Sequence, residues 1–93
     1  MIKLVDNDIY RDGQKVGWLD GGRVYDKSGK KLGHVAGNDI YDHSGNKKAY
    51  VEGGHIELQN DSKKISIDDN RKHVKGGTHS DTTRAAVRIL MGD

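Results

Sequence analysis

The 93-residue sequence contains no cysteine, no proline and no phenylalanine. The absence of cysteine excludes disulfide bonds, thiol catalysis and thiolate metal sites. Hydrophobic residues make up 32% of the chain and aromatic residues 5%, so a chain of this length buries only a small core. Thirteen glycines without proline indicate tight turns rather than a disordered, proline-rich chain. We therefore expect one domain, residues 1–93, built from short elements.

What the chain does contain is a repeat. Residues 8–22 read DIYRDGQKVGWLDGG, residues 23–38 read RVYDKSGKKLGHVAGN, and residues 39–54 read DIYDHSGNKKAYVEGG. A fourth copy, residues 55–77, begins with HIEL, ends with KHVKGG and has a longer middle. The opening position of each copy is aliphatic: Ile9, Val24, Ile40 and Ile56. The next position is aromatic three times and then acidic: Tyr10, Tyr25, Tyr41 and Glu57. Such β-branched and aromatic residues favour strands.

The middle of each copy predicts a hairpin turn. Asp12-Gly13 suits a two-residue type I′ turn, while Lys27 to Gly29 and His43 to Gly45 suit a longer loop with a left-handed glycine and a G1 bulge. The copies end on Gly22, Asn38, Gly54 and Gly77, residue types that tolerate positive φ. We therefore expect a sharp left-handed corner between successive hairpins.

Strand alternation assigns the side chains to two faces. If Ile9 and its equivalents point inward, the tyrosine column points outward. The second strand of each copy pairs a ring with an aliphatic residue: Trp18-Leu19, His34-Val35, Tyr50-Val51 and His73-Val74. The aliphatic members are expected inside and the rings outside. Because an isolated hairpin is marginally stable, four hairpins sharing one apolar face are needed for a core.

Four tandem hairpins of this IYDxSGxKxGxVxG type resemble the four-fold β-flower domain, a family of mostly bacterial and phage-associated proteins. The resemblance covers residues 8–77. It implies four hairpins around a pseudo-four-fold axis and no established activity. The fourth copy departs from the pattern at Glu57 and in its longer middle, so closure of the ring there stays open. We expect a mainly β fold with a short C-terminal helix.

The remaining segments are expected to add three strands and a helix. Ile2 to Val5 is expected to form an extra strand that completes a sheet edge or pairs near the fourth copy. Lys63 to Asp69 alternates like a strand, with Asp69-Asn70 as a turn before a strand at Arg71 to Lys75. Residues 81–91 are expected to be helical, capped by Ser80 or Asp81 and stopped by Gly92. The face of this helix containing Ala86, Val87 and Leu90 is expected to cover an open end of the β-structure or to dock on another subunit.

The charge pattern and the N-terminal sequence bear on partners and localisation. The net charge is +2, and 16 basic and 14 acidic residues are interleaved. Nucleic-acid binding is not expected, because such proteins gather Lys and Arg on one face. The pairs Lys30-Lys31, Lys47-Lys48 and Lys63-Lys64 recur at repeat spacing and are read as solvated turns, the alternative being a basic rim. No signal peptide or membrane span is visible. We expect no membrane association and a cytoplasmic protein or phage particle component.

Catalytic and metal sites are not expected. The most enzyme-like clusters are His43-Ser44 and His79-Ser80-Asp81, but neighbours on a turn do not make a triad, which is defined by geometry. Zinc needs three or four converging ligands, and the scattered histidines do not show that spacing. No cofactor is implied.

The outward rings are the candidate contact residues: Trp18, His34, Tyr50, His73, Tyr10, Tyr25 and Tyr41. Around a four-fold axis, Trp18 would lie opposite Tyr50 and His34 opposite His73. Three roles are open: packing between hairpins, a contact patch for a partner or ligand, or a metal held by the two histidines. We expect a non-enzymatic structural or protein-interaction module that forms a homo-oligomer or binds a protein partner. The alternative is a module that binds a glycan or cell-wall polymer.

Overall fold

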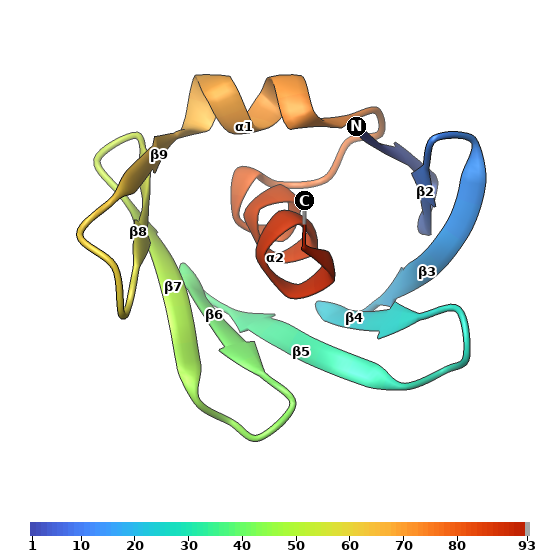
Figure 1. The fold of residues 1–93 in the computed structure, drawn as a ribbon, viewed down its shortest axis with the longest axis horizontal. Coiled ribbons are helices and arrows are strands. Elements are labelled where there is room, and N and C mark those ends of the chain that lie inside the picture. Colours follow the sequence, from blue (N-terminus) through green and yellow to red (C-terminus); the bar gives the residue numbers. More distant parts are fainter. Residues whose placement is uncertain (93) are drawn as a thin grey trace.

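The computed structural model, which describes residues 1–92, is a ring of strands around one helix (Figure 1). The strands are β1 (Ile2–Val5), β2 (Asp8–Arg11), β3 (Gln14–Asp20), β4 (Arg23–Asp26), β5 (Lys31–Ala36), β6 (Asp39–Asp42), β7 (Lys47–Glu52), β8 (His55–Leu58), β9 (Lys64–Ser66) and β10 (Val74–Lys75). The helices are α1 (Ile67–His73) and α2 (Asp81–Met91). The ten strands form one sheet in the order β10-β1-β2-β3-β4-β5-β6-β7-β8-β9. The expected mainly β fold of tandem hairpins with a C-terminal helix is confirmed.

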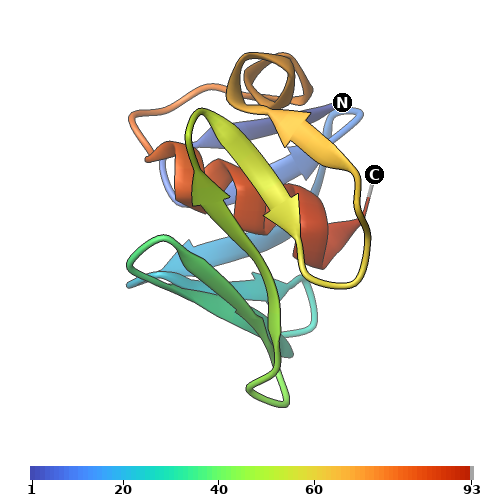
Figure 2. The same cartoon turned by 90° about the vertical axis from the view of Figure 1, so that its left-hand side faces the viewer.

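Successive turns alternate between the two ends of the ring. The turns inside the copies, β2–β3, β4–β5, β6–β7 and β8–β9, share one end, which we call the loop end. The turns between copies, at residues 6–7, 21–22, 37–38 and 53–54, share the opposite end, which we call the corner end. In the side view of Figure 2, α2 runs between these ends, from its start at the corner end to the C-terminus at the loop end.

The turns inside the copies have the expected glycine conformations. Asp12 (φ 52°) and Gly13 (φ 83°) both lie in the left-handed region, as a type I′ turn requires. Gly29 and Gly45 occupy the same region in the longer loops. The predicted G1 bulge lies at these glycines, since the Asp26 amide donates to Lys30 O and the Gly29 amide to Asp26 O, and Asp42, Asn46 and Gly45 repeat the pattern. A second irregularity, which the sequence did not predict, is a register shift after the aliphatic residue of β2, β4 and β6. This shift therefore belongs to the repeat and does not depend on turn length.

The corners are made mostly by left-handed glycines. Gly21 and Gly22 have φ values of 54° and 84°, and Gly53 and Gly54 have 58° and 78°. The expectation of a positive φ at Asn38 was wrong, because the positive φ of that corner is at Gly37. The first residue of the corner is left-handed in all three copies, at Gly21, Gly37 and Gly53, and only the second residue differs at Asn38.

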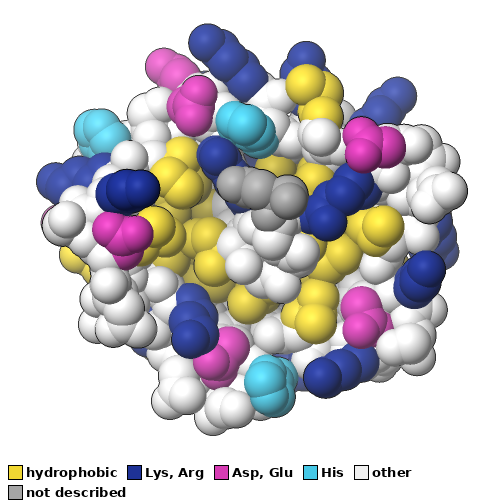
Figure 3. Space-filling view, in the orientation of Figure 1, with side chains coloured by type: hydrophobic (Ala, Val, Ile, Leu, Met, Phe, Trp, Pro, Cys, Tyr) yellow, Lys and Arg dark blue, Asp and Glu magenta, His cyan; other side chains and the backbone are white. Residues whose placement is uncertain are grey.

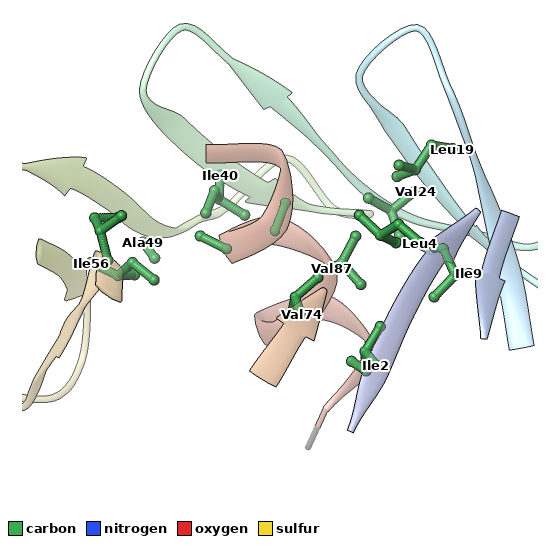
Figure 4. Packing of buried hydrophobic residues seen from close by; sticks show 13 residues of the cluster. Ile2, Leu4, Ile9, Leu19, Val24, Ile40, Ala49, Ile56, Val74 and Val87 are labelled. Atoms are coloured by element: carbon green, nitrogen blue, oxygen red, sulfur yellow. The ribbon is translucent and has the colours of Figure 1, made fainter. Parts of the chain in front are cut away.

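The core is aliphatic and lies between the ring and α2 (Figure 4). The opening residues of all four copies, Ile9, Val24, Ile40 and Ile56, are fully buried. Of the second aliphatic column, Leu19 and Val74 are buried, while Val35 and Val51 are half-buried against the same cluster. Strand alternation therefore predicted the inward face correctly.

Helix α2 occupies the lumen of the ring rather than covering one of its ends. Its Thr82, Ala85, Ala86 and Val87 are buried, and it contacts β4 to β7, β10 and α1. The predicted bounds 81–91 match, but the predicted location was wrong. Small side chains on the inner face make room for α2: a Cβ on Gly33 would lie 2.8 Å from Leu90 Cδ1. Within residues 1–92, neither helix is long and apolar enough to cross a membrane.

The fourth copy differs from the prediction after Ser66. The expected turn at Asp69-Asn70 and the strand from Arg71 are replaced by α1, whose N-cap is Ser66, with the side chain accepting a hydrogen bond from the Asp69 amide at 3.0 Å. Only Val74 and Lys75 are extended, and β10 pairs in parallel with β1. The extra strand at Ile2 to Val5 thus lies beside the fourth copy, as expected, and α1 bridges the gap between β9 and β10 (Figure 1).

Candidate binding surfaces

All five Trp and Tyr side chains lie on the outer face of the ring and none lies in the core. Each is half-buried, while its sequence neighbour on the inner face is buried. Trp18 stacks on Tyr25, with ring centroids 5.7 Å apart and planes 17° from parallel. His34 stacks on Tyr41 at 5.1 Å and 15°. We call the outward rings of β3 to β7 the aromatic band: Trp18, Tyr25, His34, Tyr41 and Tyr50.

The rings do not face one another across the axis. Cross-strand registers place Trp18 beside Tyr25 and His34 beside Tyr41, so each ring pairs with the tyrosine of the following copy. The strands that carry Trp18 and Tyr50, β3 and β7, lie on opposite sides of the ring with α2 between them (Figure 1), and the buried neighbours of both rings place them on the outer face. Tyr10 lies outside the stacked pairs, between Lys3 and Lys15 on neighbouring strands.

The fourth member of the ring column is Ser66, not His73. His55 pairs with Ser66 in the position where Arg23 pairs with His34. The amide of Ile67 donates to Gly54 O at 2.9 Å, as the amide of Val35 donates to Gly22 O at 2.8 Å. His73 instead ends α1, is exposed, and lies 4.0 Å from Asp69 through Nε2 and Oδ2. The predicted opposition of His34 and His73 was therefore wrong, because His73 does not belong to the ring column.

Lysine side chains contact the outer rings, and the sequence analysis did not predict these contacts. Lys15 Nζ lies 5.7 Å from the centroid of Trp18, and Lys47 Nζ lies 4.6 Å from that of Tyr50. Both lie within the range of a cation–π contact. The same amines pair with the aspartates that open their copies: Lys15 with Asp8 at 3.0 Å and Lys47 with Asp39 at 3.1 Å. The sequence signal for these contacts was a lysine that follows the turn in each copy.

The aspartates that begin the longer loops fold those loops. Asp26 Oδ1 accepts from Ser28 Oγ at 2.6 Å and from the amide of Lys30 at 3.0 Å, and these bonds hold the pKa of Asp26 below its ordinary value. In the next copy, the amides of Asn46 and Ser44 donate hydrogen bonds to Asp42 Oδ1 and likewise lower the pKa of Asp42. The bond from Asn46 has the larger effect. Ser44 beside His43 is therefore part of a turn, with its amide bonded to Asp42.

An apolar groove opens at the loop end beside the end of α2. It has a volume of about 530 Å³ and its apolar walls are Leu32, Ile89 and Leu90. Lys30 and Lys48 stand at its margin. Figure 3 shows this face: hydrophobic side chains gather around the middle, and Lys and Arg side chains lie around the rim with Asp and Glu side chains between them. The lysine pairs lie at exposed turns, which fits both interpretations of them, solvated turns and a basic rim.

The corner end has an open cleft of about 560 Å³ where α1, β10 and the start of α2 meet. Arg71 donates two hydrogen bonds to the carboxylate of Asp81, of 2.9 and 2.8 Å, and these lower the pKa of Asp81. Arg84 donates to Val74 O at 2.9 Å and to Gly77 O at 3.0 Å. These polar groups hold the chain segment between the helices in place.

The sequence cluster His79-Ser80-Asp81 is not assembled as a triad. His79 Nε2 contacts Asp6 O, and Ser80 is the N-cap of α2, accepting from the Thr83 amide at 3.1 Å. Within residues 1–92 no three His, Asp or Glu side chains converge on a point that could hold a metal ion. His34 and His73 lie on different elements, β5 and α1, and do not meet.

A family model described as "4-fold beta flower protein" matches residues 4–86. The match begins within β1, spans all four hairpins and extends into the first half of α2. No curated protein and no solved structure matches the chain.

Proposed function

Because the chain belongs to the 4-fold beta flower protein family, a family of unknown function, we propose from its surface that it is a non-enzymatic module that binds a protein partner through the aromatic band. The observation that carries this proposal is the exclusion of Trp18 and every tyrosine from the core. The aliphatic core does not use these rings, although large rings are usually the side chains with most apolar area to bury. Protein interfaces are enriched in Trp, Tyr and Arg at the positions that contribute most to affinity.

The aromatic band is already ordered in the free protein. The pairs Trp18–Tyr25 and His34–Tyr41 restrain the rings, and the contact with Lys47 restrains Tyr50. Side chains that are ordered before binding lose less conformational entropy when a partner docks. The charged side chains between the rings, among them Arg23 and Asp39, would form the polar rim of such an interface.

The same geometry argues against the glycan alternative. A sugar ring stacks on an open aromatic face, whereas Tyr25 covers one face of Trp18 and Tyr41 covers one face of His34. The stacked pairs therefore leave fewer open ring faces for a sugar, while the tyrosine hydroxyls remain able to form hydrogen bonds with a protein partner.

The test is affinity capture of partners by immobilised wild-type protein and by the double variant His34→Ser, Tyr41→Ser. The matched control is Lys72→Ser on α1, an exposed site outside the band. We expect a defined partner that the control retains. The double variant should weaken its binding by about 30-fold or more, the effect of losing a side chain that contributes about 2 kcal/mol.

Thermal unfolding establishes that the double variant is folded at the capture temperature. Equal recovery of the same partners by the folded double variant would contradict the proposal. So would release of every captured protein by soluble cell-wall oligosaccharides, which would assign the band to glycans.

A further inference from the structure

Opposite charges gather at the two ends of the ring. The four loop-end segments, residues 11–15, 26–31, 42–48 and 59–64, contain nine Lys or Arg and four Asp. The four corner-end segments, residues 5–8, 20–23, 36–39 and 52–55, contain five Asp or Glu and one Arg. The charges that look interleaved along the chain are therefore separated in space, because successive turns alternate between the ends.

The two ends still carry opposite charges when the side chains that form ion pairs within the molecule are left out of the count. Lys15, Lys47 and Lys64 reach back along the outer face to Asp8, Asp39 and Glu57. Within residues 1–92, the exposed loop-end lysines that form no ion pair are Lys27, Lys30, Lys31 and Lys63. The exposed corner-end carboxylates that form no ion pair are Asp6, Asp20 and Glu52. Asp61 at the loop end and Arg23 at the corner end are exposed charges of the opposite sign that also form no ion pair, so the described segments keep an excess of three positive charges at the loop end and two negative charges at the corner end.

The end faces are also large enough to form an interface. The molecule measures 31 × 28 × 20 Å, with the ring axis along the shortest dimension (Figure 1). An ellipse with the two longer dimensions has an area of about 700 Å², close to the roughly 800 Å² per partner of a standard interface. The loop end adds an apolar centre, the groove walled by Leu32, Ile89 and Leu90.

From these observations we infer that the chain self-associates head to tail, with the corner end of one copy docked on the loop end of the next. Exposed Asp20 and Glu52 of one copy then face the lysine rim of its neighbour. The contact uses two different surfaces, so it is heterologous, and each added copy leaves one acidic and one basic end free for further stacking. This surface is separate from the aromatic band, which stays on the outside of the stack.

A second copy fits the observations better than a nucleic acid does. A nucleic acid would complement the lysines of the loop end, but it would leave the acidic corner end unexplained and would be repelled by it. A second copy supplies both complementary charges on faces of equal size. The attraction must be strongest at low salt, because the Debye length is about 30 Å at 0.01 M and about 3 Å at 1 M ionic strength.

The experiment compares two charge-reversed variants of the full chain by analytical ultracentrifugation. The loop-end variant carries Lys27→Glu and Lys63→Glu, and the corner-end variant carries Asp20→Lys and Glu52→Lys. Wild type should associate at about 0.01 M salt and dissociate at about 1 M. By the counts above, the loop-end variant lowers the charge of its loop-end segments from +5 to +1, and the corner-end variant changes that of its corner-end segments from −4 to 0. Each variant alone should therefore associate at least about tenfold more weakly than wild type. An equimolar mixture of the two variants should associate again.

Recovery in the mixture separates loss of the contact from loss of the fold, since two misfolded proteins do not restore each other. A wild type that stays monomeric at low salt and high concentration overturns the inference. Association that survives both reversals also overturns it. A monomeric wild type that binds a single-stranded oligonucleotide, with binding lost in the loop-end variant, would assign the lysine rim to nucleic acid instead.

Discussion

The indole of Trp18 lies on the phenol ring of Tyr25, with centroids 5.7 Å apart and planes 17° from parallel. The two residues are direct cross-strand neighbours on β3 and β4, which belong to different copies. The stack therefore joins the first hairpin to the second from the outside, while Leu19 and Val24, the next pair in the register, join them from the inside. His34 and Tyr41 repeat this relationship between the second and third hairpins.

The first prediction concerns the energy of this stack. In a double-mutant cycle of Trp18→Ala and Tyr25→Ala, we expect a coupling free energy of about 0.5–1.5 kcal/mol, the usual range for aromatic pairs beyond their buried area. Urea denaturation of the four proteins measures it. Trp18→Ala paired with Tyr41→Ala is the control, because these rings do not stack together and their effects should add. Equal coupling in both cycles would mean that the stack is not a specific contact.

The second prediction restores a third stacked pair. Glu57 lies beside Tyr50 in the register where Tyr25 lies beside Trp18. The change Glu57→Tyr should stabilise the protein by about 0.5–1 kcal/mol through cross-strand aromatic contact. It removes the Lys64–Glu57 pair, with a 3.3 Å contact and a 60% exposed lysine side chain, and such surface pairs contribute little.

Chemical denaturation of wild type and Glu57→Tyr measures this gain. The control Glu57→Gln loses the same ion pair without adding a ring, and it should be neutral or slightly destabilised. If Glu57→Tyr is no more stable than Glu57→Gln, the ring has no favourable contact with Tyr50.

The repeat made most of the fold predictable from the sequence. In three copies the aliphatic opening residues, the turn glycines and the ring column all agree, so alternation alone placed Ile9, Val24 and Ile40 inside and Tyr25 and Tyr41 outside. In these copies the local preference of each residue agrees with its place in the tertiary structure, and under that condition sequence patterns predict the fold well.

The fourth copy was misaligned because its ending imitates the repeat. His73-Val74 followed by Gly76-Gly77 looks like His34-Val35 followed by Gly37, yet the equivalent strand is β9 and ends at Ser66. The signal for α1 was present: Ser66 precedes acidic Asp68 and Asp69, and basic residues close the segment, which together favour a helix. Alternation in Lys63 to Asp69 outweighed that signal in the prediction.

The position of α2 could not be read from the helix itself. Its apolar face fits equally well on an end of the ring or inside it. Gly33 and Ala49 keep the inner face shallow beside α2, while a Cβ on Gly17 would collide with the backbone of β4 at Tyr25. The hairpin pattern alone does not explain this column of small residues.

The third prediction tests that space at Gly33. A Cβ there would collide with Tyr41 O and lie 2.8 Å from Leu90 Cδ1, so Gly33→Ala should destabilise the protein by about 1–3 kcal/mol. Urea denaturation measures the change. At the equivalent position of the third copy, Ala49 already accommodates a methyl group with no exposure, so Ala49→Gly should cost about 1 kcal/mol through lost burial. A neutral Gly33→Ala would mean that α2 is not packed closely against β5.

The last prediction is a pH dependence of the link between the helices. Arg71 on α1 binds Asp81 on α2 through two hydrogen bonds, and these lower the pKa of Asp81 from its ordinary value of 3.8. A carboxylate with a lowered pKa contributes stability above the unfolded value, and this contribution is lost as the pH falls through the lower, folded value. The window of loss therefore lies below pH 3.8. Arg71→Gln should melt at a lower temperature than wild type at neutral pH, and the gap should close as the pH falls through that window. In an Asp68→Asn, Asp81→Asn background, which removes both carboxylates that contact Arg71, Arg71→Gln should have the same effect at every pH. A gap in the wild-type background that stays constant into the acid range would show that Arg71 acts by packing rather than by its charge on Asp81.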